Sequence, residues 1–407
     1  MILKNVTIKI KLLKNEEMFI PISFRTSFED VYNITEYTVP EYTGTRLEPT
    51  GNNVYIHFCF FEELTSSEDG GAIYCRGSVQ RLLVEQSSFI SCKTSDDRGG
   101  GICSYSSQCV LSKICAFKCY STYSYDRCIE EEDPWFCSYS SDGQFAYISA
   151  KYDITCKNHV NDSSITHTLK DNTDPRFALC LYDGNILCTS VNLTNNECEE
   201  YTALNCCPPS SNTYRISYNS IVNNTSNGGH SCIWLRNSVS DLCCIDTCNI
   251  LNNKQTATYF GTIMAHANIL IKNSCILGNN EGNMVFYALP SRTITISNCT
   301  IDDDIFSKTR YYGSVTVNKT IERPFINALS HIAIRKCDSY FDSYGTLTVN
   351  PIVPDESSLF LISNIKKLTI VSFRSMIFIF LITMVPSDPA DYYYFYSNCI
   401  FASEFCE

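Results

Sequence analysis

The sequence predicts an all-β fold, a right-handed parallel β-helix solenoid of about ten to twelve stacked coils. The composition is rich in Ile, Thr, Tyr, Phe, Ser and Asn, which favours strands joined by polar turns. A repeat of 24 to 29 residues runs through the chain. Inside each repeat the apolar residues alternate with a period of two, as in a strand with one buried face.

An apolar anchor residue marks each repeat. Positions seven and five residues before the anchor are mostly apolar as well, as in Val54 and Ile56 before Phe61. The 76 residues between Phe117 and Leu193 leave room for three periods, so two further coils are expected there. The eight anchors are Phe61, Phe89, Phe117, Leu193, Ile221, Ile250, Leu277 and Ile301.

Weaker matches extend the pattern toward both ends. They are Val6, Ile8 and Leu13 at the start, Ile332, Ile334 and Cys337 further on, and Leu368, Ile370 and Phe373 near the end. A coil of about 25 residues cannot enclose a core alone, so it must stack on copies of itself about 4.8 Å apart. We therefore expect an N-terminal cap or first irregular coil over residues 1–50 and a parallel β-helix over 51–350. An irregular insertion is expected near 120–180, and C-terminal coils and a tail over 351–407.

Asparagine pairs follow four of the anchors. They are Asn195-Asn196, Asn223-Asn224, Asn252-Asn253 and Asn279-Asn280. Asn tolerates the left-handed backbone that a sharp corner needs, and stacked amides can hydrogen-bond from coil to coil. The pairs therefore predict a structural ladder in preference to a ligand site.

Cysteine forms a second column, two residues before the anchor. It includes Cys59, Cys115, Cys248, Cys275 and Cys299, with Cys337 as a further candidate. Two interpretations stay open: buried thiols packed as small apolar groups, or disulfides between neighbouring coils. Disulfides are expected more strongly in the middle segment, which contains Cys103, Cys109, Cys115, Cys119, Cys128, Cys137 and Cys156. The chain has no Cys-x-x-Cys pair among its 24 cysteines, which argues against structural zinc.

A glycine-rich motif carries a family resemblance. Gly70-Gly71-Ala72-Ile73, with Phe89 sixteen residues after Ile73, resembles the GGAI and FxxN repeat of bacterial polymorphic outer membrane proteins, and Gly99-Gly100-Gly101-Ile102 looks like a degenerate copy. Residues 50–305 also resemble Cys- and Asn-rich right-handed β-helix proteins of parasitic protists. These families share the pectin-lyase-like fold, and the resemblance implies a surface or secreted role such as adhesion. Physically, the Gly pairs suit a tight corner with positive φ.

Four short segments resemble catalytic motifs of enzymes with this fold. Asn172-Thr173-Asp174, Gly229-His230, Asp302-Asp303-Asp304 and Ile334-Arg335-Lys336 resemble the motifs of galacturonan hydrolases, but in the wrong order. Glycoside cleavage needs two carboxyl groups about 5 to 9.5 Å apart, and these pieces fall on distant coils. Asp302-Asp303-Asp304 could hold calcium, although a solvated corner is favoured. No catalytic, cofactor-binding or metal-binding residue is assigned.

The formal net charge of −12 makes nucleic acid a poor partner. The longest apolar run, Met376–Val385, is half the length that spans a bilayer, so a buried strand is favoured over a membrane anchor. No secretory signal pattern is seen. We expect a non-enzymatic protein with an extended interaction or adhesion surface for proteins or glycans of a host or of its own cell. A polysaccharide-active lyase or glycoside hydrolase is the alternative. A surface or secreted location is expected, with an intracellular one as the alternative.

Overall fold

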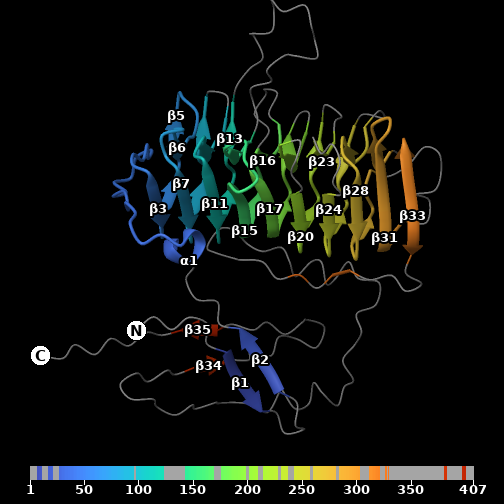
Figure 1. The fold of residues 1–407 in the computed structure, drawn as a ribbon, viewed down its shortest axis with the longest axis horizontal. Coiled ribbons are helices and arrows are strands. Elements are labelled where there is room, and N and C mark those ends of the chain that lie inside the picture. The colour runs from blue at the N-terminus through green and yellow to red at the C-terminus, as the bar shows by residue number, and fades with distance from the viewer. Residues whose placement is uncertain are drawn as a thin grey trace, which may run out of the picture. The chain divides into compact units, whose positions relative to one another are not determined.

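The computed structural model describes residues 27–95, 98–122, 143–168, 176–198, 201–209, 214–227, 231–236, 243–256, 260–280, 284–302 and 311–320, with short pieces at 7–11, 17–21, 326–327, 329, 380–382 and 397–399. The chain divides into two compact units, Met1–Leu347 and Thr348–Glu407. The first unit is the predicted all-β, right-handed solenoid of parallel stacked coils (Figure 1).

Each turn of the solenoid adds strands to two large parallel sheets, one of 16 strands and one of nine. The 16-stranded sheet begins each turn with β3 (Asn53–His57), β7 (Arg81–Glu85), β11 (Gln108–Ser112), β15 (Lys157–Thr166), β17 (Asn185–Thr194), β20 (Tyr214–Ser217), β24 (Cys243–Asp246), β28 (Ile269–Lys272), β31 (Thr293–Ile301) and β33 (Ser314–Thr320). After a bend the same sheet continues in β4 (Phe60–Glu62), β8 (Ser88–Ile90), β12 (Cys115–Phe117), β21 (Ser220–Val222), β25 (Asn249–Leu251) and β29 (Cys275–Leu277).

The chain then turns a corner and enters the second large sheet. Small corner sheets are formed by β5 (Thr65–Ser66), β9 (Lys93–Thr94) and β13 (Tyr120–Ser121), and by β18 (Glu197–Cys198), β22 (Thr225–Ser226) and β26 (Lys254–Gln255). The nine-stranded sheet contains β6 (Ile73–Cys75), β10 (Ile102–Ser104), β14 (Ala146–Ser149), β16 (Leu179–Tyr182), β19 (Leu204–Cys207), β23 (Ile233–Leu235), β27 (Ile263–Ala265), β30 (Phe286–Ala288) and β32 (Tyr311–Tyr312).

Left-handed residues make the corners. The bend inside the 16-stranded sheet has one residue per turn with φ between 47° and 57°: Phe58, Gln86, Lys113, Asp162, Ser190, Tyr218, Thr247, Asn273 and Asn298. The next corner has a second set, Glu63, Ser91, Lys118, His167, Asn195, Asn223, Asn252 and Gly278. The prediction that Asn supplies a left-handed corner is confirmed, but the position accepts many other residue types.

The second Asn of three pairs forms the predicted amide ladder. Nδ2 of Asn196 donates to Oδ1 of Asn224, Nδ2 of Asn224 to Oδ1 of Asn253, and Nδ2 of Asn253 to Oδ1 of Asn279, each at 2.9 Å. All four side chains are buried. At the last pair Gly278 takes the left-handed corner position that Asn195, Asn223 and Asn252 hold in the earlier turns, so Asn279 joins the ladder and Asn280 does not.

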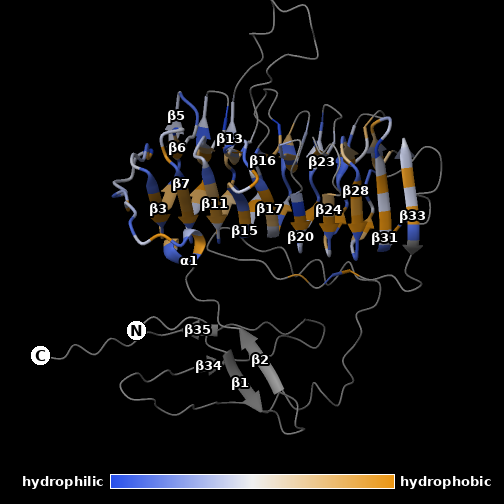
Figure 2. Ribbon diagram, viewed as in Figure 1, coloured by the Kyte–Doolittle hydropathy of each residue, from blue (hydrophilic) through white to orange (hydrophobic). Residues whose placement is uncertain are grey.

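The core runs through the whole stack as one cluster of inward-facing apolar side chains. Figure 2 shows the strands carrying the hydrophobic residues and the turns at their ends more hydrophilic. The predicted inward positions Val54, Ile56, Tyr214, Ile294 and Ile296 all lie in this core.

Two predicted anchors are wrong by one residue. Phe89 pairs with Ala116, so Phe117 faces outward, and Ile250 pairs with Ile276, so Leu277 faces outward. A slip of one residue exchanges the two faces of a strand. The sequence pattern missed it because apolar side chains cover part of the outer face too, where Phe117 packs against a cluster with Ile90.

The one-residue shift also changes which cysteines of the predicted column face inward. Cys248 and Cys299 face inward as predicted, and Cys59 packs against the same core. Cys115 and Cys275 lie on the outer face instead, and Ile114 and Ser274 take their inward places.

The middle of the stack contains one turn where two were expected. Ala116 pairs with Ile165, and Ile165 pairs with Leu193, so Ile165 is the single missing anchor. Within 143–182 the described strands are β14, β15 and β16, joined by turns, and 123–142 lie outside the described residues. Among the described residues, ten strands from β3 to β33 follow one another in the 16-stranded sheet, one in each turn, at the lower end of the ten to twelve coils predicted.

Helix α1 (Phe28–Tyr32) lies against the outer face of the 16-stranded sheet at the first turns. Its Phe28 packs on Tyr55, Leu83 and Val110 at the outer face of the first turns. Of the loose matches near the start, Ile8 does not lie in a coil, because its strand β1 (Thr7–Lys11) pairs antiparallel with β2 (Glu17–Pro21). Val6 and Leu13 lie outside the described residues.

A short piece after the last strand returns to the 16-stranded sheet. The amide of Asn249 donates to the carbonyl of Asn327 at 2.8 Å and accepts from its backbone N–H at 3.0 Å. Ile326 packs beside Leu251 and Cys275. The weaker repeats predicted at Ile332–Cys337 and Leu368–Phe373 lie outside the described residues.

The second unit is described only at β34 (Phe380–Ile382) and β35 (Ser397–Cys399), which pair antiparallel. β34 falls within the apolar run Met376–Val385, and the rest of that run lies outside the described residues. Where the structure describes the chain, no helix has the length and hydrophobicity needed to cross a membrane.

Candidate functional site

The outer face of the nine-stranded sheet carries a column of mainly aromatic side chains. Successive strands bring one middle residue each into register along the solenoid: Tyr74, Cys103, Tyr147, Cys180, Asn205, Trp234, Met264, Tyr287 and Tyr312. Parallel pairing at one residue per turn repeats whatever the sequence places there. We call this column, with the rings and arginines that contact it, the aromatic stripe.

Neighbouring rings of the stripe stack along the solenoid axis. Tyr201 stacks on Trp234 with centroids 4.8 Å apart and an interplanar angle of 11°, and Tyr287 stacks on Tyr312 at 4.9 Å and 15°. Phe177 continues the first stack below Tyr201. Phe177 and Tyr201 are buried within the first stack, Trp234 and Tyr287 are half-buried, and Tyr312 at the end of the second stack is exposed.

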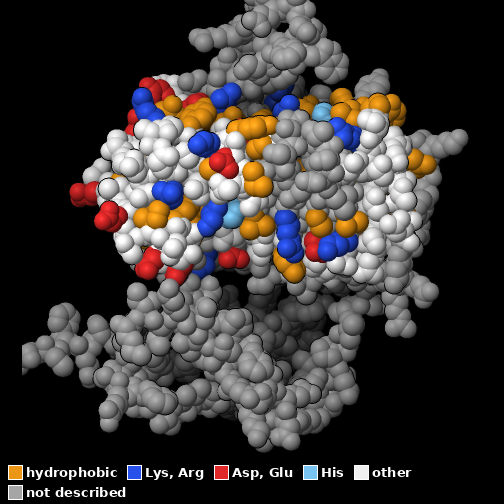
Figure 3. Space-filling view, in the orientation of Figure 1, with side chains coloured by type: hydrophobic (Ala, Val, Ile, Leu, Met, Phe, Trp, Pro, Cys, Tyr) orange, Lys and Arg blue, Asp and Glu red, His pale blue; other side chains and the backbone are white. Residues whose placement is uncertain are grey.

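Arginines lie over several of these rings. The guanidinium of Arg236 is 4.4 Å from the Trp234 centroid, and that of Arg98 is 4.6 Å from the Tyr147 centroid. Arg46, Arg76 and Arg176 contact rings of the stripe in the same way. Along the edge of Figure 3 over β6, β16 and β23, basic and hydrophobic side chains are interspersed. The chain as a whole has a net charge of −12, so the arginines of the aromatic stripe give this face a charge that differs from the chain's average.

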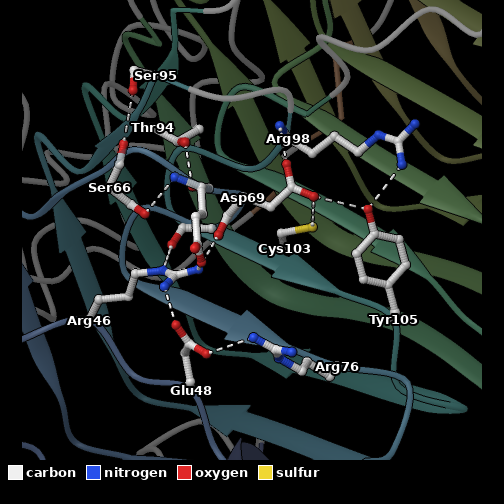
Figure 4. Close-up of polar contacts among 12 residues, drawn as sticks. Arg46, Glu48, Ser66, Asp69, Arg76, Thr94, Ser95, Arg98, Cys103 and Tyr105 are labelled. Atoms are coloured by element: carbon white, nitrogen blue, oxygen red, sulfur yellow. Dashed lines mark hydrogen bonds and ion pairs between the residues drawn. The ribbon is translucent and has the colours of Figure 1, made fainter.

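A polar cluster closes the N-terminal end of the stripe (Figure 4). Asp69 accepts hydrogen bonds from the backbone N–H of Arg98 at 2.9 Å and from the Tyr105 hydroxyl at 3.1 Å. Arg98 donates to the same hydroxyl at 2.9 Å. The Cys103 thiol lies 3.7 Å from Asp69.

Arginine 46 links this cluster to the first turn. It donates to the backbone carbonyls of Asp69 at 2.7 Å and Gly70 at 2.8 Å, and it pairs with Glu48 and Glu68. Arg76 approaches Glu48 at 3.4 Å, with 66% of its side chain exposed. The cluster fixes Arg46 and leaves Arg76 extended toward solvent.

The ionisation of the cluster argues against nucleophilic chemistry. Burial, with the nearby Asp69 carboxylate, raises the pKa of the Cys103 thiol well above its ordinary value. Burial also raises the pKa of the Tyr105 hydroxyl. A neutral thiol and a neutral phenol can donate hydrogen bonds but are weak nucleophiles and bases.

A second charged group lies on the outer face of the 16-stranded sheet. The Asp246 carboxylate is 3.2 Å from Nζ of Lys272 and 3.8 Å from Arg215, and it accepts from Asn273 at 3.0 Å. Burial opposes ionisation, but the hydrogen bonds from Asn273, Lys272 and Thr247 lower the pKa of Asp246 overall. Figure 3 shows basic and acidic side chains gathered over β20 and β24.

Other titratable groups are held in neutral forms. Burial raises the pKa of the Cys188 and Cys275 thiols to about 12. Burial lowers the pKa of His159 and His266 to about 4. No group of three or more His, Cys, Asp or Glu side chains within the described ranges could hold a metal ion.

Most of the sequence's chemical candidates lie outside the part of the chain that the structure describes. Asn172-Thr173-Asp174, Gly229-His230, Asp303-Asp304 and Ile334-Arg335-Lys336 lie outside the described residues. Asp302 accepts a hydrogen bond from the backbone N–H of Gly278 at 3.0 Å, as expected for a corner residue.

Free thiols predominate among the described cysteines. There are 18 free thiols, and Cys115 is disulfide-bonded. The disulfides expected at Cys103, Cys109, Cys119 and Cys156 are absent, because these side chains are buried free thiols. Cys128 and Cys137 lie outside the described residues.

The sequence analysis missed the aromatic stripe. Its signal was present in part: an aromatic residue between two apolar ones, as in Ile73-Tyr74-Cys75 and Ile233-Trp234-Leu235. The anchor columns lie in the other sheet, so these segments were not aligned with each other. The Tyr-rich stretches at Tyr120–Tyr125 and Tyr392–Tyr396, which the sequence suggests as contact surfaces, fall mostly outside the described residues.

The chain matches no protein-family model, no curated protein and no solved structure.

Proposed function

We propose that this chain is a non-enzymatic β-solenoid that presents the aromatic stripe as an extended interaction surface for a protein partner. The observation that carries the proposal is the composition of the stripe: Tyr, Trp and Arg side chains on one sheet face. These residue types are enriched at protein interfaces and dominate their binding energy.

The stacking geometry favours protein over glycan as the partner. A sugar ring binds best on an open aromatic face, but the faces of Tyr201 and Trp234 cover each other. Ring edges, hydroxyls and guanidinium groups remain, and these suit backbone carbonyls and carboxylates of a protein. Glycans stay the second candidate ligand.

The proposed setting is a cell surface or the extracellular space. The resemblance to pectin-lyase-like β-helix proteins of parasitic protists and to polymorphic outer membrane proteins supports it, as does the disulfide at Cys115. Antibody labelling of intact source cells tests this part. Signal confined to the interior of permeabilised cells would contradict a surface role.

Binding variants test the stripe itself. Arg236→Ala and Tyr287→Ala remove side chains from its C-terminal half, and Tyr218→Ala removes an exposed ring from the other sheet as a matched control. We expect binding of the purified chain to source or host cells to fall about 30-fold in the double stripe variant, a typical hot-spot loss. The control should bind as the parent does.

The outcome is informative in either direction. Protease treatment of the cells should abolish binding, whereas loss after glycosidase treatment alone would assign the ligand to glycans. Equal binding by the stripe variant and the parent, with matching circular dichroism spectra, would rule out the stripe as the interaction surface.

The alternative, a polysaccharide-active enzyme, is favoured only by the Arg215–Asp246–Lys272 group. A single carboxylate tied to two cations lacks the second carboxyl that glycoside hydrolysis needs. Incubation with uronate-containing polysaccharides checks it. New reducing ends or unsaturated products that disappear in Lys272→Ala would establish the enzyme and displace the binding proposal.

A further inference from the structure

Two buried thiols lie one above the other at a corner of the solenoid. Phe89 pairs with Ala116 in neighbouring parallel strands, so Cys92 and Cys119, each three residues further on, occupy equivalent positions in successive turns. The backbone N–H of Tyr120 donates to the carbonyl of Cys92 at 3.1 Å, which fixes this register. Both side chains are fully buried.

The environments of the two thiols repeat from turn to turn. Sγ of Cys92 lies 3.5 Å from the carbonyl oxygen of Phe61, and Sγ of Cys119 lies 3.5 Å from that of Phe89. The two thiols are also hydrogen-bonded to each other. Equivalent residues in stacked strands are about 4.8 Å apart, within the Cα range that a disulfide spans.

The corner position has a clear role elsewhere in the stack. In the later turns it holds Asn196, Asn224, Asn253 and Asn279, whose amides join the turns through side-chain hydrogen bonds. Cys92 and Cys119 take the same position in the earlier turns but lack the donors and acceptors of an amide. A covalent bond between them would supply the missing link.

We propose that Cys92 and Cys119 are an oxidation site, at which a peroxide converts the stacked thiols into a disulfide that joins two turns of the solenoid. In the first step the Cys92 thiolate attacks hydrogen peroxide, which forms a sulfenic acid and releases hydroxide. The Cys119 thiolate then displaces the hydroxyl group, so the sum is two thiols and one peroxide giving one disulfide and two waters.

The ionisation of the two thiols fits this order. The hydrogen bond from Cys119 lowers the pKa of Cys92 despite its burial. Burial, together with Cys92, raises the pKa of Cys119. The thiol with the lower pKa is the one that attacks the oxidant first. Because both thiols are buried, the oxidant reaches them only when the corner opens. The strands beside this corner, β9 and β13, have only two residues each, so few backbone hydrogen bonds must break for it to open.

Peptide mapping tests the bond directly. Trypsin places Cys92 alone on Leu82–Lys93 and Cys119 alone on Cys119–Arg127, while Cys115 falls on Ile114–Lys118. After peroxide treatment of the full chain we expect a linked pair of the first two peptides, absent from Cys92→Ser. Thermal unfolding of the parent should shift upward by several degrees on oxidation, and that shift should be lost in the variant.

A matched pair of thiols provides the control. Cys75 and Cys109 are both buried, and Cys75 helps burial to raise the pKa of Cys109 without a hydrogen bond between the two thiols. Their peptides, Leu47–Arg76 (which also carries Cys59) and Gly99–Lys113 (which also carries Cys103), should show no Cys75–Cys109 link under the same conditions. The proposal is overturned if the Cys92 and Cys119 peptides remain unlinked while the half-buried Cys59 is oxidised, or if the control peptides link equally.

Discussion

At the residue scale, the buried Asn ladder shows how one side chain can join three turns. Asn224 donates to Asn253 and to the Leu193 carbonyl, and its Oδ1 accepts from the N–H and the Nδ2 of Asn196. Every hydrogen-bonding group of this buried amide is used. A buried amide without partners would cost free energy, so the ladder specifies the register of the turns.

Asn224→Ala should therefore lower the free energy of unfolding by about 3 kcal/mol, because several buried partners lose their bonds at once. Asn227→Ala removes only an exposed bond to Glu197 and should change it by less than about 0.5 kcal/mol. Denaturant unfolding monitored by circular dichroism measures both. Equal losses in the two variants would contradict the role assigned to the ladder.

Histidine burial predicts a pH dependence. The folded-state pKa of His159 and His266 is about 4, lowered first by burial and then by Lys157 beside His159 and by Arg236 and Arg292 beside His266. The unfolded state binds protons from about pH 6.5, so it gains protons before the folded state does.

Stability should thus fall as the pH drops from about 6.5 toward 4, and this contribution should level off below the folded-state pKa. Unfolding free energies measured across that range check the sign. His266→Gln should flatten part of the slope. A slope that is unchanged in this variant would show that other groups dominate the titration.

At the element scale, the two glycines of each pair at the corners are needed for different reasons, the first for its positive φ and the second for the close approach of neighbouring turns. Gly70 and Gly99 have φ of 72° and 67°, as the glycine pairs predicted. Gly71 and Gly100 serve a different need: a Cβ on Gly100 would meet the carbonyl oxygen of Tyr120 at 2.2 Å. The turns pack too closely there for any side chain.

Gly100→Ala is expected to destabilise the solenoid by several kcal/mol, because backbone must move to admit the methyl group. Gly77→Ala is the matched control, since its Cβ would meet nothing closer than 3.6 Å. It should be neutral or slightly stabilising through the unfolded state. Thermal unfolding of both proteins decides the point, and a stable Gly100→Ala protein would contradict the close packing.

Sequence alone predicted the solenoid and the Asn corners because both depend on repetition, which is visible without coordinates. It misplaced Phe117 and Leu277 because outer and inner faces are both apolar at those strands. The stripe at Tyr74 and Trp234 was missed because it lies on the sheet that carries no anchor. Which ring meets which arginine depends on packing between turns, and no periodicity encodes that.

At the scale of the whole molecule, each turn contacts mainly the turns beside it, so stability is close to a sum of turns and interfaces. Duplication of residues 196–223 after Asn223 would insert one 28-residue turn and continue the ladder from Asn196 through its copy to Asn224. We expect this longer chain to fold with the same strand-rich circular dichroism spectrum and no lower midpoint of thermal unfolding.

A copy shortened by one residue is the control for that insertion. It would exchange inward and outward positions in the inserted turn, so it should lower the unfolding midpoint strongly. If both insertions fold equally well, register is not what holds the turns together.

The Asn ladder also has a direction. From amide to amide, each Nδ2 donates to the Oδ1 of its C-terminal neighbour and each Oδ1 accepts from its N-terminal neighbour. If the solenoid were opened across the ladder, one end would therefore have an unpaired Nδ2 donor of the ladder and the other end an unpaired Oδ1 acceptor. Two such pieces could join only head to tail, so the stacked amides set the polarity of any end-to-end assembly that this repeat can build.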